Sequence, residues 1–360
     1  MPTLAQKIGR LIIVGFDGLS PDDSGVRDVS HLITLGLVGG VIAFRHNIAS
    51  RSQITALNTY FQALTSKNNT PLLIAIDQEG GHVIRTNAIN GYDTIPSAKE
   101  FSYLPPEKQH ESSQKLASEL ADLGFNFNFA PCLDLDLGCP VISGYERSYG
   151  KSVSDVIACA QNVCMAHRHA GVIPCLKHYP GHGSAQGDTH EGIVDVTNTY
   201  QVCEGDVFHQ MVRAGFHDAI MTGHLYNNAW DPDMPATLSW RVLDNLRKEG
   251  FKGIIVSDDM HMGAIIRKFQ KTRMGDETDY RGYDSVSAAI AALRAGCDML
   301  IFSCNPSAAK GIKNFSKDYA FVHQITTGVC VAIEKSSLLK SAIEEKYLRI
   351  QKISSQYEIQ

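Results

Sequence analysis

Asp258 is the residue in this sequence best placed to act as a nucleophile. It follows the apolar run Ile254 to Val256 and then Ser257, so it leaves a buried strand at the end of that strand. A carboxylate at the end of a buried strand is held in a fixed position and can form a covalent intermediate with a bound ligand. The same position also suits an aspartate that caps the next helix, and the neighbouring Asp259 is expected to point elsewhere and to be structural.

Asp188 and His190 form a second candidate group, because one residue separates them in a glycine-rich loop. A carboxylate that reaches an imidazole fixes its tautomer and raises its basicity, as a histidine needs when it works as a general acid and base. The two side chains meet only if the loop bends suitably. The pair therefore predicts acid–base chemistry on the condition that the loop folds in this way.

The loop itself runs from Lys177 to His190 and follows the apolar run Val172 to Leu176. It contains Pro180 and several glycines, which exclude a regular helix and favour a tight fold around a ligand. Its histidines allow another interpretation as a metal cluster formed by His178, His182 and His190. However, no His-Glu-x-x-His helix is present, and histidines at such a loop commonly bind hydroxyl groups or brace the chain.

Further ligand-binding residues are predicted from charge and position. Asp77 sits at a strand end like Asp258, where its carboxylate can accept hydrogen bonds from vicinal hydroxyls. Arg147 and Lys177 supply fixed positive charge with several donors. Each of these residues alone would suit a salt bridge, so their interpretation as a site depends on their lying together.

The elements that would bring them together repeat along the chain as an amphipathic helix, a glycine and a short apolar strand. Glycine ends a helix at little conformational cost and marks the turn into a strand. Continuous apolar strands that alternate with helices indicate a parallel sheet covered by helices. The eight predicted strands lie at Leu11 to Phe16, Gly40 to Phe44, Leu72 to Ile76, Phe125 to Phe129, Val172 to Leu176, a run reaching Met221, Gly253 to Val256 and Met299 to Phe302.

Eight such strands predict an α/β fold in which a single domain forms a (β/α)8 barrel of the TIM type. An open doubly wound sheet is the alternative, but no glycine-rich dinucleotide fingerprint occurs near the N-terminus. The polar clusters follow the strands, which places them on the carboxyl-terminal face of the barrel, where barrel enzymes carry their active sites. We expect one domain over residues 1–360, ending in a surface helix at about 335–357 with Leu338, Leu339, Ile343 and Leu348.

Composition limits the classes of partner. The chain has 360 residues, 44% of them hydrophobic and 20% charged, with a formal net charge of -5 and no basic run. These values indicate a globular protein and argue against nucleic acid and anionic membranes as partners. The nine cysteines are scattered without a C-x-x-C pair, and the first apolar stretch is too short for a signal peptide. The sequence thus predicts reduced thiols, a cytoplasmic location and a small ligand. We expect a monomer, although composition does not determine the oligomeric state.

The loop from Lys177 to His190 resembles the corresponding loop of bacterial β-N-acetylglucosaminidases of glycoside hydrolase family 3. The resemblance extends from about Gly9 to Asn305. The motifs that carry it are Asp77-Gln78-Glu79-Gly80-Gly81, Asn128-Phe129-Ala130-Pro131-Cys132-Leu133-Asp134, Arg147-Ser148-Tyr149-Gly150, Lys177-His178, Pro235-Ala236-Thr237-Leu238-Ser239, Val256-Ser257-Asp258-Asp259-Met260 and Ala295-Gly296-Cys297-Asp298-Met299.

The resemblance implies a family 3 catalytic barrel domain and a role for each candidate. Asp258 would be the nucleophile, and Asp188 with His190 the acid/base dyad. The four predicted sugar ligands are Asp77, Arg147, Lys177 and His178. The implied activity is a retaining exo-β-N-acetylglucosaminidase that acts on muropeptides in cell-wall recycling, with no cofactor and no metal.

Three positions depart from the family pattern. These sites cover four residues: His82 stands where the family commonly has arginine, Ser184-Ala185 replaces Asp-Thr, and His261 stands where a small polar residue is usual. Three alternative functions also remain: phosphorolysis at the same site, a sugar-binding barrel without turnover, and a metal-dependent amidohydrolase. Assays with phosphate, with a nucleophile variant and with a chelator would distinguish them.

Overall fold

The computed structural model of the protein describes residues 2–67, 71–86, 91–270 and 278–359. Eight parallel strands form a closed barrel in the order β1-β10-β9-β7-β5-β4-β3-β2. They are β1 (Ile12–Gly15), β2 (Gly40–Ala43), β3 (Leu73–Ile76), β4 (Phe127–Asn128), β5 (Ile173–Tyr179), β7 (Ala219–Thr222), β9 (Ile254–Asp259) and β10 (Met299–Phe302). The predicted (β/α)8 barrel is therefore confirmed, and the open doubly wound sheet is excluded.

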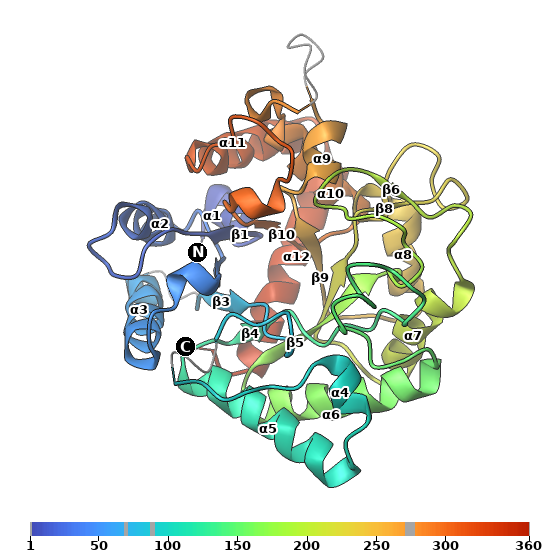
Figure 1. Cartoon of the computed structure of the whole chain (residues 1–360). Coiled ribbons are helices and arrows are strands. Elements are labelled where there is room, and N and C mark those ends of the chain that lie inside the picture. The colour runs from blue at the N-terminus through green and yellow to red at the C-terminus, as the bar shows by residue number, and fades with distance from the viewer. Residues whose placement is uncertain (1, 68–70, 87–90, 271–277, 360) are drawn as a thin grey trace.

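Helices surround this barrel, as Figure 1 shows. They are α1 (Leu4–Gly9), α2 (Ser24–Leu35), α3 (Arg51–Ala63), α4 (Ala98–Ser102), α5 (Pro106–Asp122), α6 (Val153–His169), α7 (Val202–Arg213), α8 (Trp240–Lys248), α9 (Gly263–Lys268), α10 (Ser285–Ala295), α11 (Ala320–Glu334) and α12 (Ser337–Gln356). Two short strands, β6 (Val194–Asp195) and β8 (Leu225–Tyr226), pair with each other outside the barrel.

The strands form where the sequence has continuous apolar runs, because both faces of each strand are covered. Every residue of β1, β2, β3, β7 and β10 is buried. Strand β4 is shorter than predicted, and the side chain of Asn128 there takes over part of the pairing. Its amide oxygen accepts from the Gln78 N–H, and its amide nitrogen donates to the Gln78 carbonyl, each at 3.0 Å.

The glycines predicted to end helices do so in the described structure. Gly36, Gly124, Gly171, Gly215, Gly250 and Gly296 have φ angles between 73° and 129°. A side chain is disfavoured in this region, so glycine lets the chain leave the helix and enter the next strand. This recurring turn aligns the carboxyl ends of the strands on one face of the barrel.

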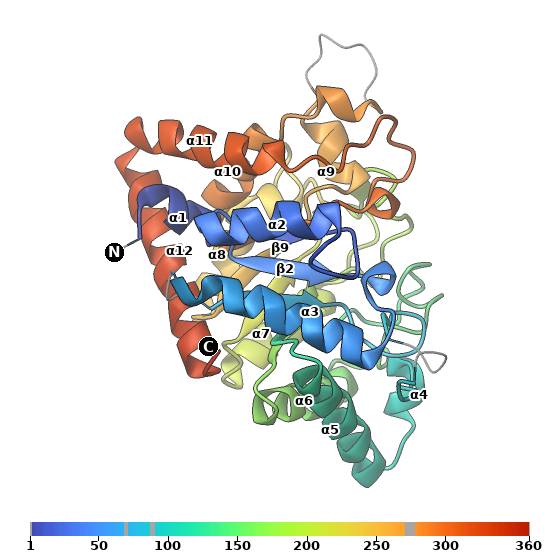
Figure 2. The same cartoon turned by 90° about the vertical axis from the view of Figure 1, so that its left-hand side faces the viewer.

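Helix α12 lies at the opposite, amino-terminal end of the barrel together with α1 and both chain ends, as Figure 2 shows. It packs against α1, α10, α11 and β9. The predicted bounds of this C-terminal helix agree with the structure, but its apolar face differs. Leu339 and Ile343 are buried, whereas Leu338 is 83% exposed and Leu348 is 58% exposed.

A buried carboxylate ties α12 to the barrel. Asp298, whose side chain is fully buried, lies 2.6 Å from the Arg247 guanidinium and 2.9 Å from that of Arg349, and Lys346 approaches it to 3.9 Å. It also accepts a hydrogen bond of 2.7 Å from the Ile255 N–H of β9. Removing this carboxylate takes the counter-charge from the buried Lys346 and from the partly buried Arg247 and Arg349, and the acceptor from the Ile255 N–H.

We expect Asp298→Ala to lower the free energy of unfolding by about 3–5 kcal/mol, because loss of one partner leaves buried charges uncompensated. The matched control is Asp244→Ala, which removes the exposed Asp244–Lys248 ion pair on α8 and should cost about 0–1 kcal/mol. Urea denaturation measures both. Equal, small losses in the two variants would show that Asp298 does not tie α12 to the barrel.

None of the described helices combines the length and the apolar character needed to cross a bilayer. All nine cysteines are free thiols, seven of them buried, which confirms the prediction that they form no disulfide framework.

Candidate active site

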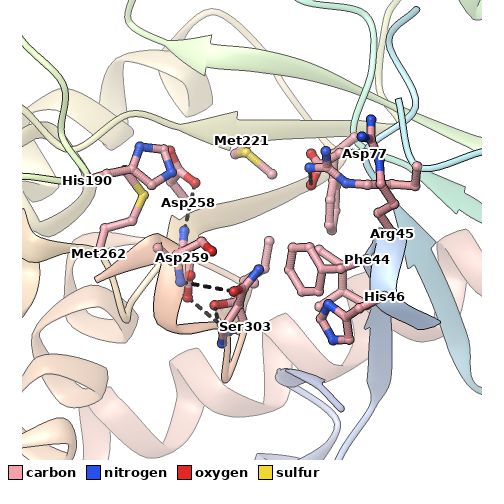
Figure 3. Close-up of a pocket in the computed structure, with 17 residues that line it drawn as sticks. Phe44, Arg45, His46, Asp77, His190, Met221, Asp258, Asp259, Met262 and Ser303 are labelled. Carbon is pink, nitrogen blue, oxygen red and sulfur yellow. Dashed lines mark hydrogen bonds and ion pairs between the residues drawn. The ribbon is translucent and has the colours of Figure 1, made fainter. Parts of the chain in front are cut away.

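All seven predicted site residues line two adjoining cavities at the carboxyl end of the barrel, with volumes of ≈ 620 Å³ and ≈ 280 Å³. Residues shared by both cavities include Asp77, Arg85, His190 and Asp258. The smaller cavity adds Arg147, Lys177, His178 and Asp188. Figure 3 shows His190 and Asp258 toward one side of the larger cavity and Asp77 across from them. The barrel therefore brings together residues that are far apart in the sequence.

Asp258 lies near the end of β9 and faces this cavity, as the sequence predicted. Burial on its own raises the pKa of a carboxyl group, but the nearby imidazoles of His224, His178 and His190 outweigh it. The net effect holds the pKa of Asp258 below its ordinary value. The side chain is consequently an anion at neutral pH, as a carboxylate nucleophile requires.

Asp188 and His190 meet in the way the acid/base hypothesis requires. The imidazole Nδ1 lies 2.6 Å from Asp188 Oδ1, and the His190 side chain is 44% exposed to the cavity mouth. Burial lowers the pKa of His190, but the hydrogen bond to Asp188 and the charges of Asp188 and Asp258 reverse this, so its pKa is raised above the ordinary value. With Nδ1 directed at Asp188, Nε2 is the nitrogen left for proton exchange with a ligand.

The ammonium group of Lys310, which lies in another loop, forms an ion pair with the aspartate of the dyad. Lys310, after β10, lies 2.7 Å from Asp188 Oδ2, the oxygen that His190 does not use. Burial raises the pKa of Asp188, but the hydrogen bonds from His190 and Lys310 depress it well below its usual range. Asp188 therefore remains ionised and can keep His190 in one tautomer.

The segment that carries the dyad is docked on α9, the helix that follows the strand of Asp258. The first N–H groups of α9, those of Gly263 and Ala264, donate to the carbonyls of His190 and Thr189, each at 3.2 Å. Arg267 donates to the Glu191 carbonyl at 3.1 Å. The candidate nucleophile and the candidate acid are thus positioned by neighbouring parts of the same structural unit.

Gly263 is required for this docking, because a Cβ at that position would lie 2.6 Å from the His190 carbonyl oxygen. We expect Gly263→Ala to displace the dyad and lower kcat by about tenfold to a hundredfold, since small misplacement of catalytic groups is costly. The control is Gly192→Ala in the same segment, where a Cβ meets only the Arg267 side chain at 3.8 Å. Steady-state kinetics of the two variants should differ; equal activity would show that the close approach is tolerated.

The sugar-ligand candidates form one charge network. Glu79 accepts two hydrogen bonds from Arg147, at 2.9 and 2.8 Å, and lies 2.7 Å from Lys177 Nζ. Lys177 also donates to Asp77 at 2.8 Å, and Arg85 donates to the other Asp77 oxygen at 3.1 Å. Burial raises the pKa of Asp77, but Lys177 and Arg85 outweigh this and hold it below its ordinary value. The network presents fixed donors and acceptors suited to a neutral, hydroxyl-rich ligand.

His178 is held by Asp134, whose carboxylate lies 2.7 Å from Nδ1. The alternative metal cluster of His178, His182 and His190 does not form: His182 Nδ1 lies 3.4 Å from Cys139 Sγ, and His190 Nδ1 faces Asp188. Among the described residues, one other trio, Cys132, Asp134 and His178, has potential ligand atoms within 4.8 Å of one another.

That trio is a poor metal site because its atoms already satisfy one another. Asp134 accepts from Cys132 Sγ at 3.2 Å and from His178, and burial raises the pKa of the Cys132 thiol well above its ordinary value. A protonated thiol is not a metal ligand, since binding requires the thiolate. The interpretation of His178 as a ligand-binding residue braced by Asp134 fits better.

Asp259, expected to be structural, has one oxygen bound to the backbone. Oδ1 accepts from the N–H groups of His261 and Ser303, at 3.0 and 2.9 Å, and the residue also lines the larger cavity. Burial raises its pKa to about 6. The neighbouring His261 is buried among aromatic rings, which lowers its pKa to about 3, so this departure from the family pattern adds a neutral side chain.

The other departures lie outside the charge network. His82 is exposed, and its ring packs 5.9 Å from that of Tyr145. Ser184 uses its backbone N–H to bind Glu204 at 3.1 Å, and Ala185 is buried in a small apolar cluster.

Four charged partners of the predicted site residues were not themselves predicted to belong to the site: Glu79, Arg85, Asp134 and Lys310. Glu79 and Arg85 both lie in the Asp77 loop, so a search for counter-charges near a strand-end carboxylate could have found them. Lys310 lies in a loop without a motif, and only the fold places it beside Asp188. No local sequence signal identifies it.

Comparisons with known proteins agree with this geometry. Residues 3–353 match the model of the glycosyl hydrolase family 3 N terminal domain. The chain is 37% identical over 278 residues to a beta-hexosaminidase of Tolumonas auensis, covering 74% of this chain and 76% of that one. It is 34% identical over 285 residues to a beta-hexosaminidase of Nitrosomonas eutropha, with 76% of each chain covered.

Solved structures give the same result. A family 3 beta-N-acetylglucosaminidase from Paenibacillus sp. str. FPU-7 superposes with a TM-score of 0.82 at 31% identity, and the match covers 100% of this chain but 63% of that protein. A beta-N-acetylhexosaminidase from Beutenbergia cavernae also has a TM-score of 0.82, with 99% of both chains covered, and its 24% identity supports the fold alone.

The barrel, the carboxylates and imidazole at its carboxyl end, and these relatives define a glycoside hydrolase. The chain belongs to glycosyl hydrolase family 3.

Proposed function

We propose that the protein is a retaining exo-β-N-acetylglucosaminidase in which Asp258 is the nucleophile and the Asp188–His190 pair is the acid/base. The observation that carries this proposal is that Asp258 and His190 line the same cavity while Asp188 holds His190 Nδ1 at 2.6 Å. The beta-hexosaminidase relatives support the same activity.

In the first step, an Asp258 carboxylate oxygen attacks the anomeric carbon, and the bond from that carbon to the leaving oxygen breaks. His190 Nε2 gives its proton to the leaving oxygen, which departs as an alcohol. In the second step, neutral His190 removes a proton from water as the water attacks the same carbon, and the Asp258 carboxylate is released. Using an imidazole as the acid avoids a second anion beside the nucleophile.

The charge network supplies binding rather than chemistry. Asp77, Arg147, Lys177 and His178 bind the hydroxyls and amide oxygen of the terminal N-acetylglucosamine in this proposal. Because Lys177 and Arg147 are already paired with Glu79, the site favours a neutral sugar over an anionic one. The site thus suits the uncharged non-reducing end of a chain.

The resemblance of the motifs supports finer assignments. We propose muropeptides as the natural substrate, a role in cell-wall recycling, a cytoplasmic location, and a monomeric catalytic domain formed by residues 1–360. No cofactor or metal enters the proposed steps. Mass spectrometry that detects release of N-acetylglucosamine from isolated muropeptides tests the proposed substrate. Light scattering tests whether the protein is a monomer.

The test of the mechanism is to trap a fluorinated N-acetylglucosaminyl substrate on the protein and to sequence the labelled peptide. We expect the label on Asp258 and a product that retains the β configuration by NMR. A label on another carboxylate, or inversion at the anomeric carbon, would refute the proposal. A chelator should leave the rate unchanged, and loss of activity on chelation would favour the metal-dependent amidohydrolase instead.

Phosphorolysis is a second candidate that one feature of the site favours. An imidazole at the acid/base position, with Lys310 behind it, repels a phosphate anion less than a carboxylate would. Turnover measured with and without phosphate distinguishes the two activities, because only phosphorolysis yields a sugar 1-phosphate.

The remaining candidate, a sugar-binding barrel without turnover, is tested by comparing sugar binding and cleavage in the parent and in a nucleophile variant. It predicts that the parent and Asp258→Ala bind N-acetylglucosamine alike and that neither cleaves a nitrophenyl glycoside.

A further inference from the structure

A groove lies at the amino-terminal end of the barrel, where α12 packs beside the end of α1 (Figure 2). Its volume is ≈ 500 Å³, and its lining includes Arg10, Pro71, Gln351, Lys352, Ser354 and Ser355. It shares no lining residue with the two active-site cavities. It is therefore separate from the catalytic centre.

Arg10, which lines this groove, is a buried cation without an anionic partner. Its residue is 4% exposed, and its two terminal nitrogens donate to the Gly39 carbonyl and to Ser354 Oγ, each at 3.1 Å. Its Nε is itself buried and finds no acceptor within the described part of the chain, so an anion in the groove would compensate its charge without touching this atom. Burial lowers the pKa of Arg10 to about 10, so the guanidinium is still charged at neutral pH.

This situation differs from that of the other buried cations in the described residues. Lys177 lies within 2.8 Å of Asp77 and 2.7 Å of Glu79, and Lys346 approaches Asp298 to 3.9 Å. Burying a charge costs free energy unless an opposite charge or strong hydrogen bonds compensate it. Arg10 has only neutral acceptors, so a counter-ion from solution would stabilise it.

The remaining residues that line the groove also favour binding of an anion. Lys352 is exposed on α12 and has no ion-pair partner in the ranges that the structure covers, and Gln351 and Ser355 add uncharged donors. No aspartate or glutamate is among the lining residues described. A guanidinium, an ammonium and hydroxyls that line one groove, with no carboxylate among the described lining, match the chemistry of carboxylate and phosphate recognition.

We propose that this groove binds an oxyanion, a phosphate or a carboxylate, with Arg10 and Lys352 as the charged contacts. The groove is larger than a single inorganic ion needs, so the anion can be one end of a larger molecule. Binding there joins α12 to the end of α1 and stabilises the amino-terminal end of the barrel. The site is independent of the glycosidase proposal.

The test measures thermal unfolding and calorimetric binding of the full chain with inorganic phosphate and, separately, with acetate, at ionic strength matched by chloride. We expect the Tm to rise with phosphate or acetate and not with chloride. A response to phosphate alone assigns the site to phosphates, and a response to acetate alone assigns it to carboxylates. No response to either anion would overturn the proposal.

Variants then locate the effect. Arg10→Met should weaken anion affinity about tenfold or more, since it removes a charge-assisted donor group. If Arg10→Met does not fold, Lys352→Glu serves instead, because Lys352 is exposed and unpaired in the described structure; its affinity should also fall several-fold. The matched control is Lys340→Glu, which makes the same charge change on an exposed position of α12 outside the groove and should bind as the parent does.

A crystal soaked in selenate gives the direct answer, because the anomalous signal of selenium locates the anion. Density beside Arg10 supports the proposal. Density confined to the cluster of Lys177 and Arg147 would overturn the proposal in favour of binding at the active site. Equal losses of affinity in Lys352→Glu and Lys340→Glu would overturn it in favour of diffuse electrostatic binding.

Discussion

Replacing Asp258 with asparagine is expected to abolish turnover of every substrate, whatever its leaving group. The amide keeps the size of the side chain at the end of β9 but cannot attack the anomeric carbon, so the proposed covalent intermediate cannot form. We expect kcat/KM to fall by a factor on the order of 10⁴ or more for both a nitrophenyl glycoside and a disaccharide. Initial rates with the two substrates measure this loss.

Asp259→Asn is the matched control, because it makes the same change one residue away. An asparagine there keeps the oxygen that accepts from the His261 and Ser303 N–H groups, and burial already raises the pKa of Asp259 to about 6. Turnover should therefore stay within about tenfold of the parent. If Asp259→Asn lost activity and Asp258→Asn kept it, the two aspartates would have to exchange roles.

Much of the fold could be predicted because local and global patterns agree. Most barrel strands begin as buried apolar runs, and each helix-ending glycine has a positive φ that marks the turn. Once eight strands close a barrel, residues such as Asp77, Lys177 and Asp258 must meet on one face. Their proximity thus follows from strand ends alone.

The partners of these residues could not be predicted in the same way. Lys310 reaches Asp188 from a loop with no motif, and the docking of His190 and Thr189 on α9 depends on backbone groups that any sequence contains. In α12 the helical period did not identify the buried face, because Leu338 and Leu348 are exposed while Lys346 is buried. Such contacts are set by tertiary packing, where a buried ion pair replaces an apolar contact.

The proposed nucleophile and acid are electrostatically coupled, which sets the protonation that each role needs. Positive imidazole character near Asp258 lowers the pKa of that carboxyl group, and the negative charges of Asp188 and Asp258 raise the pKa of His190. Around neutral pH this favours an ionised nucleophile and a protonated acid at the same time. Lys310 balances the pair by holding Asp188 ionised.

Replacing His190 with alanine should therefore affect substrates unequally. A poor leaving group, such as the second sugar of a disaccharide, needs the proton from His190 and should lose about 10²- to 10⁴-fold in kcat/KM. A nitrophenyl leaving group departs without protonation, so its bond-breaking step should change by about tenfold or less. Pre-steady-state rates separate this step from hydrolysis of the intermediate, and equal losses for both substrates would show that His190 is not the acid.

The pH dependence tests the same assignment without removing the imidazole. Because the pKa of His190 is raised, activity on the disaccharide should persist above the ordinary histidine pKa and be lost as pH rises through the raised value. Asp188→Asn removes the carboxylate that raises this pKa, so the alkaline limb should move to lower pH. Lys310→Ala removes a nearby positive charge, so the limb should move to higher pH. Shifts in the same direction for both variants would contradict the proposed dyad, because the two changes alter the charge beside His190 in opposite senses.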